Sequence, residues 1–427
     1  MKLEVVTIGT ELVLGLTPDT NAAELGRALA AAGAEVVRHV SVPDRPDAIR
    51  AAVADALERT GFVITTGGLG PTRDDMTKRE VAALFGKPLE LDPSVLRSLE
   101  ARFRRLGRPM PAVNRTQAEV PVGATVLPNP RGTAPGLWVE DRSGRVVVML
   151  PGVPSEMRGL LAEEVLPRIV ARAHQAAAGG RVVRSRTVRT TGVPESALAE
   201  RVGPIEEEIA PLTLAYLPST DGVDLRVTAW ALPEDEAERR LTAAAGRLRE
   251  RAGEHCYGEE ATDLAAAVLE RLRARHARLA VAESCTGGLL AGRITAVPGA
   301  SDVFVGGVVA YDDRVKTDLL AVPRALLDTH GAVSEAVVRA MAEGAQQRFA
   351  VDATLAVTGI AGPAGGTPEK PVGTVWLAAR CGSETRALQR IFPGDRGEIR
   401  ARAAQAALDL LRRLLESGGK EPGRGGP

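Results

Sequence analysis

Residues 61–75, GFVITTGGLGPTRDD, decide the fold class of the front of this chain. They begin as a short apolar strand, which breaks into three glycines within four positions. An alanine-rich helical pattern precedes them, and the same alternation of helix and strand is present in the first 42 residues. This β-α-β alternation predicts an α/β fold, with a parallel sheet covered by helices on both faces and ligand loops beyond the carboxyl ends of the strands.

The pattern of helices and strands divides the chain into three domains. Residues 1–168 continue the α/β alternation, whereas 177–255 follow the order strand, helix, strand, strand, helix and predict a small α+β module. Residues 259–416 return to an α/β pattern that ends in a long alanine-rich helix. Residues 417–427 have no apolar periodicity, so we expect a disordered tail there.

Composition and charge restrict the compartment and the partners. Basic and acidic residues balance at 54 each, so no global field draws the chain to nucleic acid or to an anionic membrane. The chain starts in an apolar strand without secretory-signal features, and no segment is long enough to span a bilayer, so we expect a cytoplasmic protein. Three cysteines and five histidines lack metal-ligand spacing, so any metal should be a hard divalent cation held by carboxylates.

The glycine-rich strand end predicts a phosphate site. Gly67, Gly68 and Gly70 allow backbone N–H groups to approach phosphate oxygens, and the next helix adds its positive end. Asp74 and Asp75 follow directly and form a carboxylate pair suited to holding Mg²⁺ against those phosphates. The alternative is that the glycines only turn the chain while one of the aspartates caps the helix.

Several front motifs together resemble the molybdopterin-binding-type domain of the competence/damage-inducible protein A family. They are GTELVLG (9–15), DTN (19–21), VPD (42–44), TGGLGPTRDD (66–75), LPNPRGTAPG (127–136) and MLPGVPSEM (149–157). The resemblance implies a three-layer domain and metal-dependent hydrolysis of ADP-ribose to AMP and ribose 5-phosphate. A second interpretation makes this a molybdopterin-binding or adenylyl-transfer domain.

Carried onto this chain, the resemblance implies two groups of front-site residues. The metal or catalytic candidates are Glu11, Asp44, Asp74 and Asp75. The residues that would line the nucleotide are Gly67, Gly68, Gly70, Thr72, Asn129 and Gly132. Asp44 has an alternative role, because an aspartate in VPDRPD can equally cap the helix predicted over 47–58.

The middle module resembles a KH-like fold, which is sometimes associated with RNA. The G-x-x-G clamp that RNA binding needs is not evident, and Glu206, Glu207 and Glu208 place acidic charge on the first helix. We therefore expect a structural or dimerising spacer rather than a nucleic-acid site.

The segment AVAESCTGGLLAGRIT (280–295) predicts a nucleophile platform at the back of the chain. Ser284 ends an apolar strand, and the glycine turn after it could hold an oxyanion or a phosphate. No histidine lies in the motif loops, so the base is sought in YDDRVK, where Tyr311 and Lys316 are available and a desolvated lysine near other cations can act as a base. Alternatively, Ser284 caps a helix, Tyr311 packs at a strand edge and Lys316 is solvated, and Cys285 is a rival nucleophile.

Seven back motifs resemble the C-terminal domain of the same family, which is similar to stand-alone nicotinamide-nucleotide amidohydrolases. They are AESCTGG, PGAS, YDDRVK, HGAVSE, TGIAGPAGG, PVGTVW and FPGDR. The likeness implies cofactor-independent deamidation of nicotinamide mononucleotide to nicotinic acid mononucleotide and ammonia.

By the same resemblance, Ser284 would attack the carboxamide, Lys316 would transfer the proton, and Tyr311 would orient or relay it. Oxyanion or phosphate contacts would come from Thr286, Gly287, Gly288, Thr358, Gly359, Gly362 and Arg396. Arg396 could instead be an ordinary surface arginine.

The family resemblance also implies a homodimer that acts on small nucleotides. A further interpretation, suggested by the family's name, is an accessory protein of DNA uptake. The balanced charge and the lack of a basic, aromatic-rich stripe argue against direct DNA binding.

Overall fold

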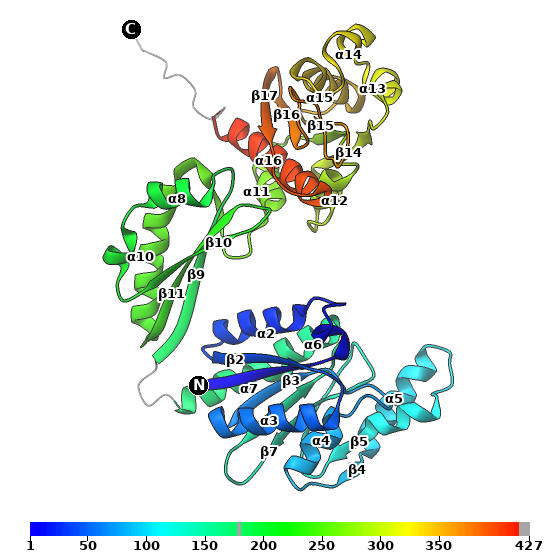
Figure 1. Ribbon diagram of the computed structural model, residues 1–427, viewed down its shortest axis with the longest axis vertical. Helices are drawn as coiled ribbons and strands as arrows, with labels where there is room; N and C mark the ends of the chain where they lie inside the picture. Colours follow the sequence, from blue (N-terminus) through cyan, green and yellow to red (C-terminus); the bar gives the residue numbers. More distant parts are fainter. Residues whose placement is uncertain (177–180, 418–427) are drawn as a thin grey trace. The chain divides into compact units, whose positions relative to one another are not determined.

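The computed structural model describes residues 1–176 and 181–417 (Figure 1). They form two compact units: Met1–Ser185 joins Thr228–Arg239, and Arg186–Val227 joins the described chain from Arg240 onward. Residues 177–180, at the start of the second predicted domain, and all but the first residue of the predicted tail lie outside the described residues. None of the helices in the described ranges is long and apolar enough to cross a bilayer.

The front domain contains one mixed sheet in the order β2-β1-β3-β8-β7-β6. The parallel strands are β2 (Glu35–Val42), β1 (Lys2–Ile8), β3 (Phe62–Thr66) and β8 (Val146–Leu150). The antiparallel strands are β7 (Gly136–Glu140) and β6 (Thr125–Leu127). The prediction of a parallel sheet is wrong at this edge, because residues 141–145 are too short a connection for the crossover that parallel strands need.

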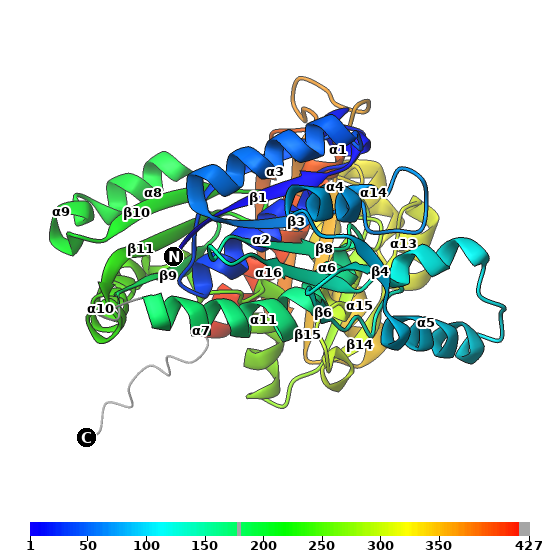
Figure 2. The same ribbon diagram turned by 90° about the horizontal axis from the view of Figure 1, so that it is seen from below.

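Helices cover both faces of this sheet, which gives the predicted three layers (Figure 2). Val5 of β1 packs on one face with Leu25, whereas its neighbour Val6 packs on the other face. Successive strand residues point to opposite faces, so each buried strand contributes to two cores. The first face is covered by α2 (Thr20–Ala31), α6 (Pro154–Leu160) and α7 (Leu166–Ala176), and the second by α3 (Pro46–Thr60) and α4 (Thr77–Leu84). The domain also contains α1 (Thr10–Val13), α5 (Pro93–Arg105), β4 (Leu89–Leu91) and β5 (Glu119–Pro121).

The middle module has the strand order β10-β11-β9-β12. Its elements are β9 (Arg181–Thr190), α8 (Glu195–Val202), α9 (Ile205–Ile209), β10 (Thr213–Pro218), β11 (Val223–Pro233), α10 (Glu234–Ala252) and β12 (Cys256–Glu259). The sequence pattern predicts one helix over 195–209, but the helix breaks at Gly203, which has φ 66°, and at Pro204, which has no N–H to donate. The unpredicted β12 pairs antiparallel with β9.

The C-terminal domain is again a sheet between two helical layers, with the strand order β14-β13-β15-β16-β17. Its strands are β13 (Leu279–Glu283), β14 (Phe304–Val309), β15 (Ala353–Gly359), β16 (Thr374–Cys381) and β17 (Glu384–Ile391). One face packs against α11 (Leu264–Arg273), α12 (Leu289–Thr295) and α16 (Arg396–Ser417). The other packs against α13 (Asp313–Leu320), α14 (Arg324–His330) and α15 (Glu335–Phe349). β13 is parallel to β14 and β15, so their carboxyl ends share one edge of the sheet.

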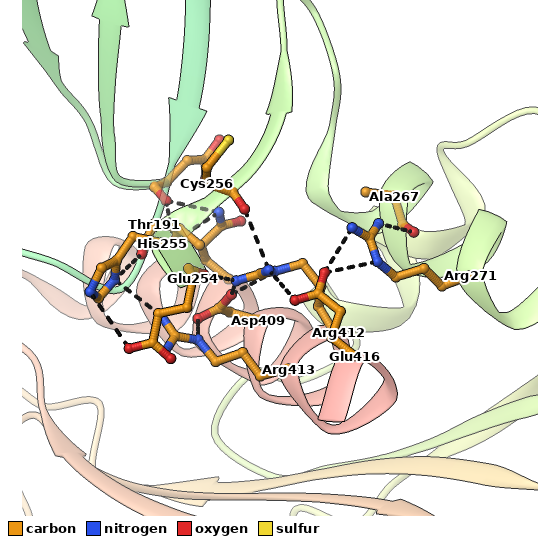
Figure 3. Close-up of polar contacts among 12 residues, drawn as sticks. Thr191, Glu254, His255, Cys256, Ala267, Arg271, Asp409, Arg412, Arg413 and Glu416 are labelled. Carbon is orange, nitrogen blue, oxygen red and sulfur yellow. Dashed lines mark hydrogen bonds and ion pairs between the residues drawn. The ribbon is translucent and has the colours of Figure 1, made fainter. Parts of the chain in front are cut away.

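The last turns of α16 contact the middle module through a buried polar cluster (Figure 3). The Arg412 guanidinium is 1% exposed and donates to Asp409 Oδ1 at 2.6 Å, to the Glu254 carbonyl at 2.6 Å and to the Cys256 carbonyl at 3.4 Å. Arg413 forms an ion pair with the Glu254 carboxylate at 2.9 Å. These contacts fix α16 to the start of β12.

Candidate active sites

The turn that carries Ser284 begins where β13 ends. The Ser284 N–H donates to the Val357 carbonyl at 2.9 Å, which continues the pairing with β15 for one more residue. Gly287 (φ 58°) and Gly288 (φ 91°) then take a left-handed backbone that other residues adopt only with strain. The N-cap of α12 is Gly288, so the alternative that Ser284 caps the helix is wrong.

Two charged side chains, one of them fully buried, hold this turn in place. The fully buried Glu283 carboxylate accepts from the N–H groups of Gly288, Leu290 and Ala291 at 3.0, 3.0 and 2.8 Å. These N–H groups begin a helix and would otherwise have no acceptor within it. From the opposite side, the Arg400 guanidinium donates to the Thr286 carbonyl at 2.7 and 3.2 Å. The sequence analysis missed both residues, although Glu283 directly precedes the serine.

The predicted nucleophile and base open into one cavity of about 210 Å³. Ser284 is 8% exposed, and Lys316 on α13 is 1% exposed, so the alternative of a solvated lysine is wrong. The ammonium donates to Asp313 Oδ1 at 2.9 Å and to the Tyr311 carbonyl at 3.3 Å. Six predicted residues line this cavity: Ser284, Tyr311, Lys316, Thr358, Gly359 and Arg396.

Arg396 and Tyr311 form a polar wall of this cavity. Arg396 is the first residue of α16, and its guanidinium donates to the Tyr311 hydroxyl at 2.9 Å and to the Gly362 carbonyl at 2.6 Å. Arg396 is therefore anchored rather than an unattached surface arginine. Tyr311 follows β14 and is 60% exposed, so its ring is not packed against a strand edge.

Cys285 lines the same cavity but is a poor rival to the serine. Burial raises the pKa of the Cys285 thiol to about 12. The thiolate is the nucleophilic form of cysteine, so a raised pKa makes this side chain unreactive near neutral pH.

Thr286, Gly287, Gly288 and Gly362 are predicted back-site residues that do not line this cavity. Thr286 is fully buried, and its hydroxyl has no hydrogen-bond partner in the described part of the chain. Gly362 supplies the carbonyl that anchors Arg396. Thr358 does line the cavity, but its hydroxyl donates to the Ala332 carbonyl at 2.9 Å. Gly287 and Gly288 shape the turn by their backbone conformation.

The front glycines lie close to neighbouring backbone and side chains. A Cβ at Gly67 would meet the Ile8 carbonyl, so this position has no room for a side chain, and a Cβ at Gly70 would meet the Asp75 carboxylate, which would have to move. Gly68, Gly70, Thr72 and Asp75 line a cavity of about 460 Å³. The glycine loop therefore forms a cavity wall as well as a turn.

Two of the predicted front carboxylates accept hydrogen bonds from loop residues. Asp75 accepts from the Thr72 N–H at 2.8 Å and also from the Thr72 hydroxyl. Asp44 accepts from the Thr10 N–H at 2.7 Å and from its hydroxyl at 3.0 Å. The N-cap of α4 is Met76 and that of α3 is Arg45, so the helix-capping alternatives for Asp44, Asp74 and Asp75 are wrong.

Glu11, Asp44, Asp74 and Asp75 do not converge into a metal cage. Over residues 1–176 and 181–417, no group of three or more His, Cys, Asp or Glu side chains is placed to hold a metal ion. Mg²⁺ is commonly bound by one or two carboxylates together with substrate phosphates. The residues present therefore fit a cation only when a substrate supplies the other ligands.

Two predicted nucleotide contacts line a separate cavity. Asn129 and Gly132 open into a space of about 470 Å³ beside α5, with Arg102 and Arg105 on its wall. The Asn129 amide donates to the Ala134 carbonyl at 2.8 Å and to Glu156 Oε2 at 2.7 Å, which fixes the loop. The predicted nucleotide contacts that line a cavity are thus divided between two cavities.

Lys78 is a front-site residue that the sequence analysis passed over. It lines the glycine-loop cavity, and its ammonium donates to the Thr116 carbonyl at 2.6 Å. Burial lowers the pKa of Lys78 to about 8. The signal that could have found it is the scarcity of lysine in a chain that otherwise uses arginine.

Comparison with known proteins follows the same division. Residues 4–171 match the probable molybdopterin binding domain, 185–258 match the damage-inducible protein CinA KH domain, and 261–415 match the CinA C-terminal domain.

Relatives match across nearly the whole chain. A CinA-like protein of Gemmatimonas aurantiaca is 54% identical over 416 residues, which cover 97% of this chain and 96% of that protein. A CinA-like protein of Gloeobacter violaceus is 45% identical over 414 residues, covering 96% of each. The crystal structure of the competence/damage inducible protein CihA from Agrobacterium tumefaciens is 40% identical where it matches, covers 35% of this chain and 93% of that chain, and has a TM-score of 0.35.

Proposed function

This chain belongs to the CinA family of competence/damage-inducible proteins, and we propose that it is a nucleotide hydrolase with two separate activities. The C-terminal site would deamidate nicotinamide mononucleotide, and the N-terminal site would hydrolyse ADP-ribose to AMP and ribose 5-phosphate. The observation that carries the proposal is the single cavity that holds Ser284 together with the buried Lys316.

In the proposed deamidation, the Ser284 hydroxyl attacks the carboxamide carbon of the nicotinamide ring. Lys316 acts as the general base that takes the hydroxyl proton and returns it to the nitrogen that leaves as ammonia. Water then adds to the acyl-enzyme and releases the carboxylate, so one amide and one water yield one acid and one ammonia. The hydrogen bonds that Glu283 and Arg400 make with the turn, which we call the clamp, support this role because they fix the backbone that carries the Ser284 hydroxyl.

Arg396 suits the phosphate of the mononucleotide. Its guanidinium lines the cavity, and guanidinium groups bind phosphate through paired hydrogen bonds. Its present partners are a phenol and a carbonyl, both neutral acceptors that an anion can displace. Tyr311 would then be released to orient the nucleotide.

The amidohydrolase proposal is tested with single substitutions in the full chain. We expect Ser284→Ala and Lys316→Met to lose at least about 10³-fold in kcat for ammonia release from nicotinamide mononucleotide. The control is Glu270→Gln, an exposed change on α11, which should retain the wild-type rate. Wild-type turnover by Ser284→Ala would refute the serine mechanism.

For the front site, support comes from the glycine-lined cavity and its cationic wall of Lys78, Arg73 and Arg79. These groups suit a diphosphate, and Asp74 or Asp75 would hold a divalent cation together with the phosphate oxygens. Such a cation supplies charge neutralisation of the phosphates when it is bound. The chain's own cations would bind and orient the diphosphate.

The front proposal is tested by assaying AMP release from ADP-ribose in the presence of Mg²⁺. Asp75→Asn should reduce the rate, while the exposed Asp47→Asn on α3 should not. The match of residues 4–171 to a probable molybdopterin binding domain favours one second candidate. Binding of a molybdopterin with no turnover of ADP-ribose would favour that candidate.

A further inference from the structure

A small third cavity lies at the carboxyl ends of three adjacent parallel strands of the front domain. It measures about 110 Å³ and is lined by Thr7 of β1, Thr66 of β3, Gly152 beyond β8, Glu11 of α1, and Asp19 and Asn21 at the start of α2. We call it the strand-end pocket. Ligands of open α/β sheets characteristically bind at this edge of the sheet.

The orientation of the Asn21 side chain is fixed by its partners. Its Nδ2 donates to the Thr66 hydroxyl at 3.1 Å and to the Gly152 carbonyl at 2.8 Å. The Thr66 hydroxyl gives its own proton to the Pro151 carbonyl, so it can only accept from Asn21. The amide nitrogen and oxygen of Asn21 are therefore assigned without ambiguity.

This orientation leaves the amide oxygen of Asn21 unsatisfied. Asn21 is 9% exposed, and its Oδ1 has no hydrogen-bond partner in the described part of the chain. A buried acceptor without a donor costs free energy, which a donor group in the pocket would recover. The Asn21 amide oxygen would therefore be satisfied by a ligand that donates a hydrogen bond.

The two carboxylates near Asn21, those of Asp19 and Glu11, differ in how many hydrogen-bond partners they have. Asp19 accepts from the Ala22 N–H at 2.9 Å and from the Ser41 hydroxyl at 3.3 Å, and it also pairs with His39 at 3.2 Å. Glu11 instead lies over Gly9, where an added Cβ would come 2.5 Å from its Oε1. The Glu11 carboxylate and the Asn21 amide oxygen are therefore two acceptors that a ligand in the pocket can use.

We propose that the strand-end pocket binds the vicinal hydroxyl groups of a ribose, with Glu11 and Asn21 each accepting one hydrogen bond. The inference rests on the proposed function in so far as the ribose would belong to ADP-ribose. A carboxylate that accepts from ribose hydroxyls is a recurrent feature of nucleotide sites in α/β folds. A divalent cation fits less well, because it needs six or more oxygens and Asp19 is already committed.

The test compares two sugars that differ by one hydroxyl. The probes are ribose 5-phosphate and 2-deoxyribose 5-phosphate, titrated calorimetrically into the full chain. We expect the wild type to bind the ribose form about tenfold more tightly or better. Glu11→Ala and Asn21→Ala should bring the two affinities within about twofold, while the exposed Glu58→Ala on α3 should leave the preference intact.

The outcomes separate this inference from the proposed function. Equal wild-type affinity for the two sugars overturns the inference, whatever the ADP-ribose assay shows. A cation site would also overturn the inference. It would appear as a rise in melting temperature with Mg²⁺ alone that Glu11→Ala abolishes, while the chain binds the two sugars equally. A preference for ribose that Glu11→Ala removes, in a chain that does not hydrolyse ADP-ribose, supports the pocket and overturns only the proposed activity. Glu11 is exposed, so its variant keeps the test valid even if Asn21→Ala fails to fold.

Discussion

Replacing Glu283 by glutamine tests whether one buried carboxylate holds the nucleophile turn. The wild-type side chain accepts three backbone N–H groups at 2.8 to 3.0 Å. Glutamine keeps one acceptor oxygen and turns an NH₂ group toward the third donor, so one charge-assisted bond worth about 1.5–3 kcal/mol is lost. The two remaining bonds become weaker because the acceptor is neutral. We expect Glu283→Gln to lower the free energy of unfolding of the C-terminal domain by about 3–5 kcal/mol.

The assay is urea unfolding of the full chain, with the midpoint taken for the transition that abolishes deamidation. A multidomain chain need not unfold in one step, so activity identifies the relevant transition. A loss in kcat larger than the change in KM is expected from a displaced Ser284 hydroxyl. Glu270→Gln is the matched control, because Glu270 is exposed on α11. If Glu283→Gln unfolded at the same urea concentration as this control, the clamp reasoning would be refuted.

Three further substitutions test buried groups. Cys285→Ala should keep the deamidation rate, because burial raises the pKa of this thiol to about 12, and the native wild type should not be alkylated at Cys285 by iodoacetamide at pH 7. Burial lowers the pKa of Lys78 from 10.5 to about 8, so Lys78→Met should be more stable than the wild type below pH 8 by at most about 3 kcal/mol. That gain should shrink between pH 8 and 10.5 in urea unfolding, because the unfolded wild type holds the proton that the folded form has lost. Arg412→Met should cost about 2–3 kcal/mol, because Asp409 keeps only Arg413 as a partner and the Glu254 and Cys256 carbonyls lose a donor, and Arg412→Lys should not restore the loss, because an ammonium cannot match the planar fork of the guanidinium.

The backbone of both sites could be predicted because strand ends and glycine turns are local signals. The strand before Gly67 stops where the glycines begin, and the strand before Ser284 stops three residues before Gly287 and Gly288. The antiparallel edge of the front sheet could not be foreseen in the same way. β7 and β8 are short apolar runs whose sequences do not indicate whether they pair parallel or antiparallel. Only the length of the turn that connects them distinguishes the two kinds of pairing.

The side-chain environment was harder to predict, because burial depends on elements far apart in sequence. Lys316 belongs to a polar run that reads as solvated, and only the packing of α13 encloses it. Asn129 is in a loop motif, yet its cavity is formed with α5, some thirty residues earlier. The role of Glu283 could not be predicted, because its carboxylate accepts from backbone N–H groups, which carry no residue signature in the sequence.

The course of α16 limits where this chain can be cut. Its first residue holds Tyr311 at the cavity of Ser284 and Lys316, and near its other end Arg412 donates to carbonyl groups that belong to residues 254 and 256. A fragment that starts after these residues lacks two acceptors of the Arg412 guanidinium and exposes this charged end of α16 to water. A C-terminal fragment keeps both of these acceptors only if it begins at or before Glu254.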